Sequence, residues 1–211
     1  MTRIAVIVGS TRPGRRAEAV AKWVEEVAGR HPAVEAGDAT VELVDLVDYD
    51  LPLLDEVMPP MFGAYNNAPT RRWAAKIGSF DGFVFVTPEY NHSIPAALKN
   101  AIDFLFKEWN DKAAGFVSYG IHGGTRAVEH LRLTLAELKV ADVRTQVVLP
   151  VFTEFQFSDP TDPTDPGVVA PGPHQVPTMM TMLDEIIAWS GALKPLRDST
   201  ASAEQRMADA R

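Results

Sequence analysis

Short runs of apolar residues alternate along the chain with segments in which apolar residues recur every three or four positions. The short runs are rich in β-branched residues and lack strict alternation, a pattern typical of strands that are buried on both faces. They predict five strands, at Arg3–Val8, Thr40–Leu46, Gly82–Pro88, Ala113–Gly120 and Val143–Val151. The periodic segments predict helices at Arg16–Arg30, Pro69–Gly78, Pro95–Trp109, Thr125–Lys139 and Pro177–Leu193.

The order of these elements predicts an α/β fold built around one sheet. Helices between successive strands require parallel pairing through right-handed crossovers, which gives a three-layer, doubly wound architecture. Because 211 residues with 46% hydrophobic content suffice for one globular domain and not for two, we expect a single domain over residues 1–195. Residues 196–211 form a polar tail, either helical or frayed.

The segment from Ser158 to Gln175, "SDPTDPTDPGVVAPGPHQ", interrupts this order with prolines and aspartates. Proline removes a backbone donor and fixes φ, so the segment cannot continue a helix or a central strand. Its composition favours a solvated excursion. The alternative is a segment that folds over a neighbouring subunit.

Composition excludes several kinds of protein. No apolar run is long enough for a membrane helix, and "RIAVIVG" is too short and too β-branched for a signal peptide, so we expect a cytoplasmic protein. The absence of cysteine excludes disulfides, thiolate metal sites and cysteine nucleophiles. A net charge of -8 gives no general attraction to nucleic acid or to anionic membranes, so any positive site must be local. The histidines and acids have no metal-ligand spacing, so we expect no metal.

The loop after the first predicted strand, "GSTRPGRR" (residues 9–16), concentrates positive charge at a helix start. Ser10 and Thr11 offer hydroxyl donors, and the three arginines offer charged, forked donors suited to phosphate oxygens. Cations at the positive end of a helix dipole are unfavourable unless an anion is present, which argues against arginines that only solubilise the helix. The loop matches neither the phosphate loop of NTPases nor G-x-G-x-x-G, which favours a phosphate monoester.

Two further loops leave the carboxyl ends of strands, where open parallel sheets bind ligands. "TPEYNHSIP" offers a rigid turn on which a flat ring can rest, and "SYGIHGG" has three glycines that allow close approach of the backbone to a ligand. Ordinary packing is an equal alternative for Tyr90 and for Tyr119. For His92 and His122, an exposed loop histidine is favoured over a catalytic one.

Together "GSTRPGRRAEAVAKWV", "LPLLDE", "TPEYNHSIPAALKNAIDFL" and "SYGIHGG" resemble the NADPH-dependent FMN reductase family, over roughly residues 3–150. This family has a flavodoxin-like fold and includes quinone, azo-dye and chromate reductases. The resemblance implies a five-stranded sheet in the order 2-1-3-4-5, a non-covalently bound FMN, and a homodimer or homotetramer. The sequence differs from commoner members at Ile121 and His122, which affects the substrate preference.

The resemblance also implies roles for individual residues. The FMN phosphate is expected on Ser10, Arg12, Ala17 and on Arg15 or Arg16, with Gly14 shaping the turn. The isoalloxazine ring is expected on Pro88, Glu89, Tyr90 and Asn91, mostly through backbone atoms. Its pyrimidine side is expected beside Ser118, Tyr119, Gly120, Gly123 and Gly124.

The implied activity is that of an oxidoreductase. FMN accepts a hydride at N5 from NADPH, and a quinone-like, azo or flavin acceptor then takes two electrons at the same place, which predicts ping-pong kinetics. The protein then needs no catalytic acid or base of its own. Two alternatives remain: a flavodoxin-type electron carrier, and a redox-sensing or partner-binding flavoprotein with little NAD(P)H turnover. A low-molecular-weight phosphatase is excluded because it requires a cysteine.

Overall fold

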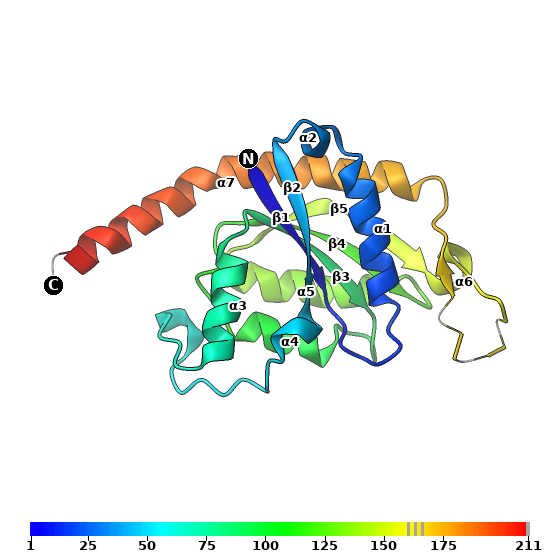
Figure 1. The fold of residues 1–211 in the computed structure, drawn as a ribbon, viewed down its shortest axis with the longest axis horizontal. Coiled ribbons are helices and arrows are strands. Elements are labelled where there is room, and N and C mark those ends of the chain that lie inside the picture. The colour runs from blue at the N-terminus through cyan, green and yellow to red at the C-terminus, as the bar shows by residue number, and fades with distance from the viewer. Residues whose placement is uncertain (160, 163, 166, 210–211) are drawn as a thin grey trace.

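The computed structural model describes residues 1–159, 161–162, 164–165 and 167–209. Five parallel strands form one sheet in the order β2-β1-β3-β4-β5, which confirms the expected architecture (Figure 1). The strands are β1 Thr2–Val8, β2 Ala39–Asp45, β3 Gly82–Pro88, β4 Ala113–Gly120 and β5 Ala141–Pro150. β1 pairs with both β2 and β3, so the order of the strands reverses beside it.

Helices flank the sheet, and a small hairpin follows β5. The helices are α1 Ala17–Gly29, α2 Pro32–Glu35, α3 Ala68–Gly78, α4 Ala96–Asp103, α5 Thr125–Glu137, α6 Val151–Glu154 and α7 Gln175–Asp209, with short 3-10 turns η1 Leu46–Tyr49 and η2 Pro60–Phe62. The hairpin pairs β6 Phe155–Gln156 with β7 Val168–Val169. Within the described part of the chain, no helix combines the length and apolar character needed to cross a membrane.

Each face of the sheet has its own hydrophobic core, because successive side chains of a strand point to opposite faces. In β1, Ala5 and Ile7 belong to the core under α3, α4 and α5, whereas Ile4 and Val6 belong to the core under α1 and α7. Figure 1 shows α1 and the orange part of α7 on one side of the strands, and α3 and α4 on the other. Because the helices over these cores cover both faces of the sheet, a ligand can approach the sheet at the ends of its strands.

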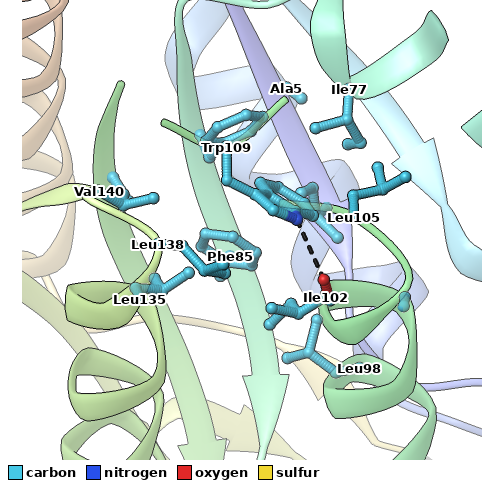
Figure 2. Packing of buried hydrophobic residues seen from close by; sticks show 14 of the residues in the cluster. Ala5, Ile77, Phe85, Leu98, Ile102, Leu105, Trp109, Leu135, Leu138 and Val140 are labelled. Carbon is cyan, nitrogen blue, oxygen red and sulfur yellow. Dashed lines mark hydrogen bonds between the residues drawn. The ribbon is translucent and has the colours of Figure 1, made fainter. Parts of the chain in front are cut away.

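The helix expected over Pro95–Trp109 is shorter than its apolar periodicity predicts, because α4 ends at Asp103. Two indole N–H groups bond its last carbonyls: Trp73 Nε1 donates to Ala101 O at 2.8 Å, and Trp109 Nε1 donates to Ile102 O at 3.1 Å. Figure 2 shows the second of these bonds. A continuing helix would give those carbonyls to backbone N–H groups four residues on. Burial of the two tryptophans therefore stops the helix.

Other element boundaries also differ from the sequence pattern. β5 begins at Ala141 rather than Val143, because Ala141 and Asp142 pair with the first residues of β4. The last helix runs from Gln175 to Asp209, well beyond the expected Leu193, and its C-terminal end extends away from the sheet (Figure 1). Of the expected proline-rich excursion and tail, residues 160, 163, 166, 210 and 211 lie outside the described residues.

Lys112 lies buried at the opposite end of the sheet from the carboxyl edge, directly before β4, with 4% of its surface exposed. Its ammonium donates to Ile77 O at 2.9 Å and Gly78 O at 3.3 Å, the last carbonyls of α3. Burial lowers the pKa of Lys112 to about 7; Arg197 acts in the same direction, and Asp81 and Glu108 oppose it. The fold therefore depends on a lysine that is costly to keep charged.

The free energy of unfolding should therefore rise between about pH 7 and pH 9.5. Over that range the unfolded chain, with an ordinary lysine pKa of about 10.4, binds one more proton than the native protein, so stability increases with pH. Lys112→Met should remove this rise, because the titrating group is gone. Urea unfolding at a series of pH values measures the slope. Lys99→Met, at an exposed position of α4, should keep it; equal slopes in wild type and Lys112→Met would contradict the prediction.

Candidate active site

The carboxyl ends of β1 and β3 meet at the point where the strand order reverses. Val8 pairs with Val86, and Gly9 N donates to Val86 O at 2.9 Å, so the loops that follow the two strands leave the sheet side by side. The crossover after β1 passes over one face of the sheet and the crossover after β2 passes over the other, which opens a crevice between these loops. The predicted site therefore lies at this crevice.

The loop after β1 is a tight turn that leads into α1. Arg15 N donates to Arg12 O at 3.1 Å, with Pro13 at the second position of the turn and Gly14 at the third with φ 67°. Pro followed by a residue with positive φ is the pattern of a type II turn, which requires glycine at the third position. α1 then begins at Ala17, and no side chain caps its N-terminus. Its first amide N–H groups are available to an anion.

The three arginines of this loop have different environments. Arg15 forms an ion pair with Asp45, Nη2 to Oδ2 at 2.5 Å, while its Nε is buried without a hydrogen-bond partner. Arg16 Nη2 donates to the backbone oxygen of Asp165 at 3.0 Å, and its guanidinium lies over the Phe157 ring, 5.4 Å from the centroid. Arg12 is exposed and lines the cavity described below.

The loop after β3 turns on two residues with positive φ. Tyr90 and Ser93 exchange backbone hydrogen bonds at 2.9 and 3.1 Å, with Asn91 at φ 48° and His92 at φ 74° between them. Two central residues of positive φ are the mark of a type I′ turn. This turn places the Tyr90 hydroxyl 2.9 Å from Ser10 Oγ. The first and second predicted loops are therefore joined by a hydrogen bond, and His92 is exposed, as the pattern favoured.

The glycine-rich loop after β4 folds back on its own strand. Ser118 Oγ donates to Gly123 O at 2.7 Å, and Gly124 adopts φ 75° just before α5. A Cβ at Gly124 would lie 2.9 Å from Tyr119 O and 3.0 Å from Ser118 Cβ, so only glycine fits there. The Ser118 hydroxyl thus holds the loop in shape, and His122 at its tip is exposed, again as favoured.

Glu89 connects the second and third loops. Its backbone N donates to Tyr119 O at 3.2 Å, and its carboxylate forms an ion pair with Arg126 of α5. The side chain is 7% exposed, and its Oε2 is buried without a partner. Glu89 therefore presents one unused acceptor in the wall of the site.

Tyr119 presents an unused donor. The residue is 5% exposed, and its hydroxyl is buried with no hydrogen-bond partner. Burial raises the pKa of Tyr119, with Tyr90 acting in the same direction and Arg12, Arg16 and Arg15 opposing it. The hydroxyl therefore stays protonated at neutral pH and can donate a hydrogen bond. From the sequence, ordinary packing was an equal alternative for Tyr119. The ring does pack, with its centroid 6.3 Å from the ring centroid of Phe155.

A cavity of about 310 Å³ joins these loops. It is lined by the predicted residues Arg12, Arg16, Pro88, Glu89, Tyr90, Tyr119 and Gly120. Of the other predicted residues, the lining does not include Ser10, Gly14, Arg15, Ala17, Asn91, Ser118, Gly123 and Gly124. Ser10 stands directly behind the wall, because its hydroxyl bonds Tyr90. Ser118 and Gly123 are bonded to each other within the loop that carries Gly120.

Five further residues complete the wall: Ile121, Val151, Phe152, Phe157 and Asp162. Sequence reasoning linked Ile121 to the substrate preference and missed the other four. Val151 and Phe152 follow β5, whose carboxyl end lies at the same edge of the sheet, so their position was available as a signal. Phe157 and Asp162 belong to or border the proline-rich segment, so its description as a solvated excursion is incomplete. Among the described residues, no group of three or more histidines and acids is placed to hold a metal ion.

Comparison with known proteins identifies close relatives. The NADPH-dependent FMN reductase family matches residues 2–154. An NAD(P)H-dependent FMN reductase of Schizosaccharomyces pombe is 40% identical over 171 residues, covering 80% of this chain and 79% of the relative. A quinone reductase of Escherichia coli is 34% identical over 142 residues, covering 64% of this chain and 70% of the relative.

Solved structures show the same fold at lower identity. The flavoenzyme NAD(P)H:(acceptor) oxidoreductase FerB of Paracoccus denitrificans superposes with a TM-score of 0.67 at 21% identity, covering 91% of this chain and 98% of that chain. At this identity the likeness concerns the flavodoxin-like fold alone.

Tyr119→Phe should stabilise the flavin-free protein. Removal of a buried hydroxyl without a partner relieves a desolvation cost and should raise the free energy of unfolding by about 1 kcal/mol. Tyr65→Phe is the matched control, because the Tyr65 hydroxyl donates to Glu108 Oε2 at 2.8 Å. Loss of that bond to a charged group should lower the free energy of unfolding by about 1.5 kcal/mol or more. Urea denaturation measures both; destabilisation by Tyr119→Phe would show that its hydroxyl has a partner.

Proposed function

Because this chain belongs to the NADPH-dependent FMN reductase family, we propose that it binds FMN in the cavity between its three loops. The enzyme is of the NAD(P)H-dependent FMN reductase and quinone reductase type. The proposal extends to a ping-pong reaction, in which NADPH and then a quinone-like, azo or flavin acceptor use the same cavity in turn.

Two buried donors carry the proposal. Arg15 Nε and the Tyr119 hydroxyl have no hydrogen-bond partner, and both belong to the loops that meet at the crevice. Buried polar groups of folded proteins are nearly always paired, so these donors indicate an acceptor-rich ligand. The uncapped N-terminus of α1, beside Arg15, and the arginines of the loop are positive. They favour a negatively charged ligand. A flavin that ends in a phosphate monoester meets both requirements.

The residues present therefore fit FMN. For the phosphate, Arg12 and Arg16 supply charge in the cavity wall, and Ser10, Gly14, Arg15 and Ala17 supply donors and the shape of the turn. For the ring, Pro88, Glu89, Tyr90 and Asn91 supply one wall, and the opposite side is built from residues of the loop after β4. These are Ser118, Tyr119, Gly120, Gly123 and Gly124.

Bound FMN supplies the hydride chemistry of the reaction. The residues of the chain then have to bind, orient and exclude water. The Tyr90–Ser10 hydrogen bond fixes the ring-binding turn against the phosphate loop, and the Glu89–Arg126 ion pair fixes it against α5. Because these supports are preformed, binding needs little reorganisation. No side chain is assigned as a catalytic acid or base.

A homodimer or homotetramer is part of the proposal. The segment that runs from η1 to the end of η2 exposes large apolar side chains, with Leu53 82%, Val57 88% and Phe62 59% exposed. Grouped exposed apolar residues are typical of protein–protein contacts. A second copy of this chain is the partner that the family resemblance implies.

The visible absorption spectrum tests the proposed function directly. Protein mixed with FMN and desalted should stay yellow, and anaerobic NADPH should bleach it, because the cavity holds FMN and admits the nicotinamide. A yellow protein that NADPH does not bleach would favour the electron carrier or the sensor. A colourless protein would contradict FMN binding itself.

Arg12→Ala should weaken FMN binding about 10- to 100-fold, because it removes a charge-assisted contact of about 1.5 to 3 kcal/mol. Quenching of flavin fluorescence gives the dissociation constant. Arg144→Ala is the control, since Arg144 is an exposed arginine of β5 outside the cavity wall. Equal affinities of wild type and Arg12→Ala would remove Arg12 from the phosphate site.

A further inference from the structure

The hairpin after β5 lies beside the proposed FMN site. β6 and β7 pair antiparallel, Phe155 with Val169 and Gln156 with Val168. The residues that the structure describes between them are 157–159, 161–162, 164–165 and 167, and we call these residues the hairpin loop. It begins beyond residue 154, where the match to the family ends. In Figure 1 it is the yellow segment beside α6.

The base of the hairpin is closed by hydrogen bonds and packs against the sheet. Glu154 is buried, and its Oε2 accepts a hydrogen bond from Gly172 N at 2.6 Å. Its backbone oxygen accepts from Ala170 N at 2.9 Å. Phe155 packs against Tyr119 in the core under α1 and α7. The hairpin loop is therefore held at one place along the edge of the cavity.

The aspartates of the hairpin loop accept hydrogen bonds from other residues of the same loop. Asp159 accepts from Thr161 N, and Asp162 accepts from Thr164 N, each at 2.8 Å. Asp165 accepts from Ser158 N at 2.7 Å and from Gly167 N at 2.8 Å. These bonds lower the pKa of all three carboxyl groups, so the loop is negatively charged at neutral pH.

Two contacts of Arg16 join the hairpin loop to the phosphate loop. Arg16 is bonded to the backbone oxygen of Asp165 and lies over the ring of Phe157. Phe157 and Asp162 line the cavity together with Arg12 and Arg16. The hairpin loop thus orients one arginine and closes the cavity on the side of the phosphate-binding turn, and it places one carboxylate in that wall.

We infer that the hairpin loop selects the cofactor by its size and charge at the phosphate end. This inference rests on the proposed function. A monoester phosphate carries about two negative charges, which Arg12 and Arg16 balance. A cofactor whose phosphate continues into a second nucleotide, as in FAD, needs an exit through the wall formed by Phe157. It would also bring its second phosphate toward Asp162, and like charges in such a position repel. The hairpin loop therefore admits FMN and rejects FAD.

The test uses three flavins and a shortened hairpin. Residues 157–167 are replaced by Asn-Gly, a two-residue turn suited to joining Gln156 to Val168. Binding of riboflavin, FMN and FAD to flavin-free protein is measured by fluorescence quenching. The ratio of FMN to riboflavin affinity reports phosphate recognition, and the ratio of FMN to FAD affinity reports closure. The shortened hairpin should lower the FMN-to-FAD preference by at least about tenfold, with preference for FMN over riboflavin retained through Arg12.

A pair of point variants keeps the test independent of loop removal. Asp162→Asn keeps an acceptor for Thr164 N and removes the charge from the wall, so FAD affinity should rise relative to FMN affinity. Asp159→Asn is the matched control, because Asp159 makes the equivalent bonds to Thr161 and does not line the cavity. It should leave the preference unchanged.

The possible results separate the two proposals. Equal affinity of the wild type for FMN and riboflavin would overturn the phosphate site, and the inference with it. Two results would overturn the inference alone, provided that the wild type prefers FMN over riboflavin. One is a wild type without preference for FMN over FAD. The other is a preference for FMN over FAD that is unchanged in the shortened hairpin and in Asp162→Asn. A preference that falls in both variants and not in Asp159→Asn supports it.

Discussion

The parallel pairing of β1 with β3 is the constraint on which the site depends. Because Val8 and Val86 lie side by side, the loops that begin at Gly9 and Glu89 leave the same edge of the sheet together. The two hydrophobic cores then fill both faces with helices, so this edge is where backbone and polar side chains remain accessible. Ser10 and Tyr90 are 80 residues apart in the chain, and their hydrogen bond follows from this pairing.

An acidic protein can still build a positive site, because charge acts locally. The net charge of -8 is spread over the chain, whereas three arginines and the uncapped N-terminus of α1 converge on one turn. The structure distinguishes arginines that look equivalent in the sequence. Asp45 engages Arg15, the hairpin loop engages Arg16, and Arg12 stays exposed at the cavity. A partner in the folded protein, rather than spacing in the loop, decides which charge is available to a ligand.

The parallel, doubly wound sheet and most of the cavity wall could be predicted, because alternation of elements and the glycine-rich and tyrosine-containing loops are local signals. The strand order 2-1-3-4-5 was implied by the family resemblance, and the structure confirms it. The end of α4 could not be predicted, because Leu105 and Phe106 continue its apolar periodicity. The contacts of the buried indoles of Trp73 and Trp109 with its last carbonyls arise only in the folded protein. The sequence offered Arg15 or Arg16 as a phosphate contact and gave no sign of the pairing of Arg15 with Asp45, which joins residues 30 positions apart. Contacts of this kind depend on packing in three dimensions.

The contacts of the proline-rich segment could not be predicted from its composition. Its position can be explained in part by the topology of the sheet. Any segment that follows β5 starts at the carboxyl edge of the sheet, so a hairpin inserted there begins next to the ligand crevice. Its proximity is thus a consequence of strand direction. What topology does not require is the hydrogen bond from Gly172 to Glu154 that closes its base, or the contact of Phe157 with Arg16. Those contacts make the adjacent segment part of the cavity wall beside the phosphate-binding turn. FMN and FAD share the ring and differ beyond the phosphate, so this part of the wall acts on the difference between the two cofactors.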